Sequence, residues 1–113
     1  MITCFIEYRI DPYKTAEFES YARQWISLVA RFGGRHHGYF LPHEGANDIA
    51  YACFSFPSMA DYEQYRRDSR QDKDCEAAYT FARQTQCIIR YSRSFMKPVL
   101  KSSIKSNTNE GTD

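Results

Sequence analysis

The first 34 residues change their hydrophobic repeat from two residues to three or four, and this switch strongly restricts how the chain can fold. Residues 2–10 alternate between two sets of side chains, which predicts a half-buried strand. An Asp-Pro pair follows, and this pair favours the start of a helix. Residues 12–32 carry apolar side chains at helical spacing, and a Gly-Gly pair ends the helix. A strand followed by a long amphipathic helix therefore opens the chain.

The remaining segments continue the alternation of strands and helices. Strands are predicted over residues 35–41 and 49–56, with a turn-forming segment between them, so the two strands should form an antiparallel hairpin. A second helix begins near residue 58, where Ser precedes Asp by three positions in the manner of a capping box. After a charged interruption, a third helical piece covers about residues 75–84. A fourth strand covers residues 87–96.

The order β-α-β-β-α-β predicts an α+β fold of the ferredoxin-like kind, with a four-stranded antiparallel sheet and its helices on one face. The length of 113 residues fits a single domain, which we place at residues 1–100. Residues 101–113 are polar and are predicted to form a flexible tail. The second face of the sheet lacks a helix, so sheet-to-sheet pairing of two copies is expected to cover it.

Composition excludes several classes of function. The formal net charge is +1, so no overall field attracts nucleic acid or acidic membranes. No apolar run approaches the ~20 residues needed to span a bilayer, and the chain opens on a strand pattern, which indicates a cytoplasmic protein. None of the four cysteines has the spacing of a CxxC or zinc motif. The expected partners are a second copy, in a homodimer or a higher assembly, and a small molecule.

The segment from Arg35 to Arg66 contains several short motifs in a distinctive order. A strand reads Gly-Tyr-x-Leu-Pro (38–42), a short loop contains Gly45, the next strand ends in Ser-Phe-Pro-Ser (55–58), and a helix carries Tyr-x-x-Tyr-Arg (62–66). Each motif is weak alone, but their order is fairly specific. In this order the motifs closely resemble bacterial NIPSNAP-domain proteins.

The resemblance extends over about residues 2–100. It implies a dimeric α/β barrel, in which two ferredoxin-like chains pack sheet against sheet. Related members of that superfamily include cofactor-independent monooxygenases of aromatic polyketides and haem-degrading enzymes. The NIPSNAP branch has no agreed enzymatic activity, so the resemblance supplies no set of catalytic residues for this chain.

Aromatic residues on several predicted strands and on the long helix would line a cavity if they converge beneath the helices. Arg66 on the second helix is a further candidate, although Arg66, Arg67 and Arg70 together have the pattern of a solvated helix face. The candidate ligand-binding residues are Tyr8, Trp25, Tyr39, Tyr51, Arg66 and Tyr91. Packing against the helices is the alternative role for the aromatic residues.

His36 and His37 are adjacent in the second strand, so their side chains should point to opposite faces of the sheet. A histidine that titrates near neutral pH can act as an acid or a base, and His37 is the candidate catalytic residue. A hydrogen-bonded structural histidine is the alternative. His37, His43 and Glu44 are the only local set that resembles a two-histidine, one-carboxylate metal site. Because the turn supports them loosely, no metal site and no cofactor are predicted.

The sequence leaves the function open among three hypotheses. The leading one is a homodimer that binds or oxidises a small aromatic-type ligand in a cleft between helices and sheet, with monooxygenase-like chemistry without a cofactor if it is an enzyme. The second is a non-catalytic module for protein binding or assembly. The third is a haem-binding variant, for which His37 or His43 would supply the axial ligand.

Overall fold

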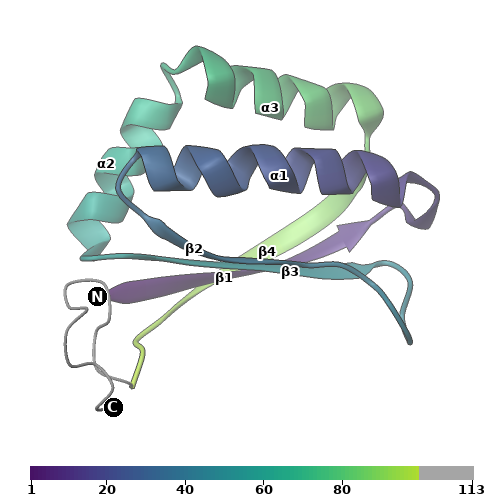
Figure 1. Ribbon diagram of the computed structural model, residues 1–113, viewed down its shortest axis with the longest axis horizontal. Coiled ribbons are helices and arrows are strands. Elements are labelled where there is room, and N and C mark those ends of the chain that lie inside the picture. The colour runs from purple at the N-terminus through teal and green to yellow at the C-terminus, as the bar shows by residue number, and fades with distance from the viewer. Residues whose placement is uncertain (100–113) are drawn as a thin grey trace.

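The computed structural model describes residues 1–99, arranged as a sheet with helices packed on one face (Figure 1). The predicted tail at 101–113 lies outside the described residues. The elements are β1 (Ile2–Ile10), η1 (Pro12–Lys14), α1 (Thr15–Arg31), β2 (Arg35–Phe40), β3 (Ile49–Phe56), α2 (Met59–Ser69), α3 (Lys73–Thr85) and β4 (Ile88–Met96). The predicted elements are all present, and their ends differ from the predictions by a few residues.

The sheet has the strand order β2-β3-β1-β4, and every neighbouring pair of strands is antiparallel. This arrangement confirms the ferredoxin-like α+β fold. The second helical region is divided in two because Asp72 caps a new helix, accepting a hydrogen bond from the Cys75 backbone N–H at 2.9 Å. Gly33 adopts a φ of +94° after α1, the left-handed conformation that glycine permits at a helix end.

The inner face of the sheet carries the core. Strand alternation places one set of β1 side chains under the helices, and Cys4, Ile6, Tyr8 and Ile10 are all buried. The register of β1 against β3 adds Phe54 and Phe56 to the same face. Trp25 and other apolar residues of α1 pack onto this layer, so α1 is held by its apolar stripe.

A β-bulge in β2 changes which side chains share the inner face. His36 pairs with Phe54 and Gly38 pairs with Cys53, so His37 is an extra residue between them. Gly38 accommodates the bulge at a φ of +122°. Simple alternation would place residues 36 and 39 on opposite faces. With the bulge, the His36 and Tyr39 rings stack on the inner face at a centroid distance of 5.0 Å.

The outer face of the sheet is aromatic and is not covered by any helix of residues 1–99 (Figure 1). Phe5, Phe40 and Tyr51 are 43 %, 57 % and 46 % exposed. Near the Phe5 end of this face, the Thr3 and Ser55 hydroxyls form a hydrogen bond of 2.7 Å. The part of the chain that the structure describes contains no helix long and apolar enough to cross a membrane.

Candidate functional site

An open cleft lies between the helices and the inner face of β4. α3 packs against α1 and leaves much of the edge strand β4 uncovered. The cleft has a volume of about 890 Å³. Its lining contains four tyrosines, namely Tyr8, Tyr21, Tyr79 and Tyr91. These come from β1, α1, α3 and β4, so the fold assembles the site from distant parts of the chain.

The charges of the cleft all have one sign. Its lining contains Arg66, Arg70, Arg83 and Arg93, and no aspartate or glutamate. None of these four arginines forms an ion pair within residues 1–99. A chain with a net charge of only +1 therefore concentrates positive charge in this cleft. Such a cleft attracts anions.

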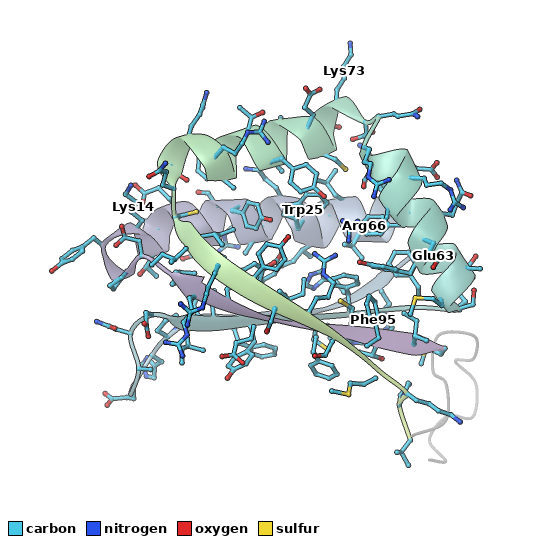
Figure 2. The ribbon with its side chains drawn as sticks, turned by 180° about the vertical axis from the view of Figure 1, so that it is seen from behind. Lys14, Trp25, Glu63, Arg66, Lys73 and Phe95 are labelled. Carbon is cyan, nitrogen blue, oxygen red and sulfur yellow. The ribbon has the colours of Figure 1, made fainter. Side chains whose placement is uncertain are left out.

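A smaller cavity of about 40 Å³ lies further in, beneath α1. It is lined by Trp25, His36 and Tyr39 together with residues that also line the open cleft, so the two spaces adjoin. Figure 2, in which β4 lies in front of the sheet, shows Arg66 pointing from α2 into the space between helices and sheet where Trp25 also lies. The inner cavity is thus the narrow end of the cleft.

Two guanidinium groups meet near this inner end. Arg66 and Arg93 both donate hydrogen bonds to the Tyr62 hydroxyl oxygen, at 2.8 and 2.7 Å. Arg66 comes from α2 and Arg93 from β4, so the phenol oxygen links the helix to the sheet edge. The two like charges share this oxygen with no carboxylate among the residues that line either space.

Three buried phenols of the site are neutral at physiological pH. Burial, reinforced by neighbouring phenols, raises the pKa of Tyr8, Tyr21 and Tyr39 well above the ordinary value. The Cys75 thiol is also inert, because burial and the adjacent Asp72 raise its pKa to about 12. These groups supply no base or nucleophile near pH 7.

His36 is the histidine that faces the inner cavity. The Gly38 backbone N–H donates to its Nδ1 at 2.9 Å, so the proton of the neutral ring is assigned to Nε2. Desolvation, with a smaller contribution from the charge of His37, lowers the pKa of His36 to about 4. His36 is therefore a neutral hydrogen-bond donor near pH 7.

This lowered pKa predicts an acid-sensitive fold. Between pH 6.5 and about 4 the unfolded chain binds a proton at His36 that the folded chain does not, so stability falls as the pH falls. We expect about 1–2 kcal/mol from this residue, a value reduced for partial solvent screening. Urea unfolding across this range should show a smaller acid-induced loss in His36→Gln than in the wild type. Equal losses in the two proteins would contradict the assignment.

The structure brings five of the six candidate ligand-binding residues together. Tyr8, Arg66 and Tyr91 line the cleft, while Trp25 and Tyr39 line the inner cavity. Tyr51 lies on the outer face, because its register partner on β1 is the outward-facing Glu7. The expectation that Tyr51 converges with the others is therefore corrected by the register.

His37, the candidate catalytic residue, also lies on the outer face, where its Nε2 is 2.8 Å from the Ser55 hydroxyl. Neither His37 nor the turn residue His43 lines the cleft or its inner cavity. The opposite directions expected for the two neighbouring histidines are observed. Within residues 1–99, no three or more His, Cys, Asp or Glu side chains are grouped so that they could hold a metal ion.

The sequence reasoning missed Arg93, Tyr21, Tyr79 and the inward role of His36. A signal for Arg93 was present, since it follows Tyr91 by two positions on the same strand and must share its face. Arg93 and Arg66 come together only once β4 and α2 are placed in space, so no sequence pattern shows their contact.

The sheet, its one-sided helical layer and the open aromatic cleft define a protein of the ferredoxin-like α+β class. A cofactor-independent oxygenase from Streptomyces nogalater has this fold, with a TM-score of 0.62 and 14% identity over 88% of this chain and 94% of that chain. The NIPSNAP family model matches residues 3–103. The chain therefore belongs to the NIPSNAP family.

Solved NIPSNAP structures share the fold. A NIPSNAP family protein from Agrobacterium tumefaciens has a TM-score of 0.74 and 22% identity, covering 92% of this chain and 98% of that chain. A second protein of that family and organism, described as having unknown function, has a TM-score of 0.75 and 19% identity, covering 87% of each chain. No curated protein matches this chain.

Proposed function

We propose that the protein binds a small molecule with a flat aromatic or apolar body in the cleft between its helices and β4. The observation that carries this proposal is the open cleft of about 890 Å³ with four tyrosines in its lining. Ligand sites are usually concave, mostly apolar and roughly 300–1,000 Å³ in volume. Ring faces suit flat ligands, and neutral phenols at the edge of a ring provide hydrogen bonds.

The test narrows the cleft without changing its charge. Ala82 of α3 lines the cleft, so Ala82→Phe should fill part of it and weaken binding by about tenfold or more. Trp25, the single tryptophan of the chain, lines the inner cavity, so its fluorescence reports titrations with a panel of neutral and anionic phenylalkyl compounds.

The matched control is Ala77→Phe, the same substitution at an exposed position of α3 outside the cleft. It should leave binding unchanged within about twofold. Thermal melts of both variants report whether they fold. The proposal is wrong if no compound of the panel binds, or if the two variants weaken binding equally.

For oxidation, the activity stated for the Streptomyces protein, the cleft provides proton donors. His36 is only a weak base near pH 7, because its pKa is about 4 and its Nδ1 already accepts the Gly38 N–H, and burial keeps the Tyr8 and Tyr21 phenols neutral. The site therefore supports ligand binding more directly than it supports oxidation. A ligand that enters already ionised would need no base from these residues for an oxidative reaction.

The outer face of the sheet supports a symmetric dimer. Its exposed aromatic residues lie on a surface that the helices leave open. A second copy offers the same surface, and a two-fold pairing would cover both faces at once. This pairing uses the face opposite the cleft, so dimerisation and ligand binding are compatible.

A further inference from the structure

Three buried N–H groups around the inner cavity lack an acceptor within residues 1–99. They are Trp25 Nε1, His36 Nε2 and Arg93 Nε. All three residues line the cavity of about 40 Å³. An unsatisfied buried donor costs about 1–3 kcal/mol, so such groups are uncommon unless something else meets them. Three at one place indicate that the cavity is built to receive an acceptor.

The chemistry of the three groups is uniform. Tryptophan and arginine only donate hydrogen bonds, and the Gly38 N–H occupies His36 Nδ1, which leaves Nε2–H as a donor. A water molecule brings two hydrogens as well as its lone pairs. A carboxylate brings only acceptor lone pairs, and it therefore matches this set of donors better.

The positive charge around the inner cavity also favours an anionic ligand. The guanidinium groups of Arg66 and Arg93 are held close together by the Tyr62 hydroxyl, and no acidic residue lines the cavity or the cleft. Two neighbouring cations gain energy when an anion lies between or beside them. Hydrogen bonds from guanidinium to carboxylate are shorter and about twice as strong as those between neutral groups.

We infer that the ligand is a carboxylic acid whose carboxylate enters the inner cavity and whose apolar body occupies the open cleft. This inference rests on the proposed function and specifies the ligand class for the same site. The inner volume of about 40 Å³ exceeds the ~10–15 Å³ that one water requires but is too small for a ring. The wide outer cleft can hold the aromatic ring of the ligand, so the acid group is the part that enters the inner cavity.

The experiment compares two probes of the same shape, 4-phenylbutanoate and 4-phenylbutanamide. Both are transparent at the red edge of tryptophan absorption, so Trp25 fluorescence can follow each titration. The acid is expected to bind at least about tenfold more tightly than the amide. Arg93→Gln should reduce this acid-to-amide ratio to about twofold or less while retaining amide binding, which also shows that the variant is folded.

Arg67→Gln is the matched control, since Arg67 is exposed on α2 and lines neither the open cleft nor the inner cavity. It should retain the preference for the acid within about threefold. Equal binding of acid and amide would overturn the inference and leave the proposed function standing. An acid preference that survives Arg93→Gln would also overturn it. Failure of both probes, together with the failure of the wider panel, would overturn the proposed function itself.

Discussion

Replacing Phe18 by alanine is expected to lower the free energy of unfolding by about 3–5 kcal/mol. Phe18 is fully buried, and its ring lies 5.0 Å from Tyr8 and 5.9 Å from both Tyr21 and Tyr39, measured between centroids. Removing the ring would leave a cavity beneath three residues that shape the ligand site. Each aromatic pair that Phe18 forms also contributes about 0.5–1.5 kcal/mol beyond the buried area, and the substitution removes this contribution as well.

Urea denaturation followed by circular dichroism measures this effect, at one protein concentration because assembly changes apparent stability. Ser27→Ala on the exposed side of α1 is the control and should stay within about 0.5 kcal/mol of the wild type. If Phe18→Ala lost less than about 1 kcal/mol, the aromatic layer would be loosely packed, and the described cleft would not be a fixed shape.

Placing a charge on the outer face is expected to dissociate the proposed dimer. Phe5 lies on the central strand β1, between Cys53 of β3 and Ser94 of β4, and it is 43 % exposed. In the symmetric pairing, Phe5→Glu would bury an unpaired carboxylate from each copy. A buried unpaired charge costs about 3–5 kcal/mol, which corresponds to a dissociation constant weaker by about a hundredfold or more.

Sedimentation velocity over a range of concentrations would show the shift from dimer to monomer. Tyr13→Glu is the matched control, because Tyr13 is 93 % exposed in η1, away from the sheet. It should sediment like the wild type. A wild-type protein that is monomeric throughout, or a Phe5→Glu variant that remains dimeric, would refute the proposed interface.

The fold was accessible from the sequence because the relevant signals are local. The alternation in residues 2–10 and the helical spacing up to Val29 depend on neighbours along the chain, and the structure confirms both. The boundary between α2 and α3 also had a local signal in the charged segment before Cys75. Three-dimensional packing then decided only where each element ends.

The site was less accessible because it depends on register and distance. Counting along β3 cannot tell which face Tyr51 takes until the strand is paired with β1. The meeting of Arg66 and Arg93 on Tyr62 joins residues 27 positions apart through a third side chain. Sequence patterns indicate which residues share an element, but they do not show which groups remain without hydrogen-bond partners.

The bulge in β2 adds a residue to the outer face of the sheet while His36 and Tyr39 stay together on the inner face. Because His37 is an additional residue, deleting it would leave His36 and Tyr39 two positions apart, so regular alternation would keep both rings on the inner face. A single-codon deletion would thus remove the His37 side chain, which contacts the Ser55 hydroxyl on the outer face, and leave both rings of the inner cavity in place. During divergence of such proteins, loss of this one residue can therefore change the outer face while the inner face keeps its rings.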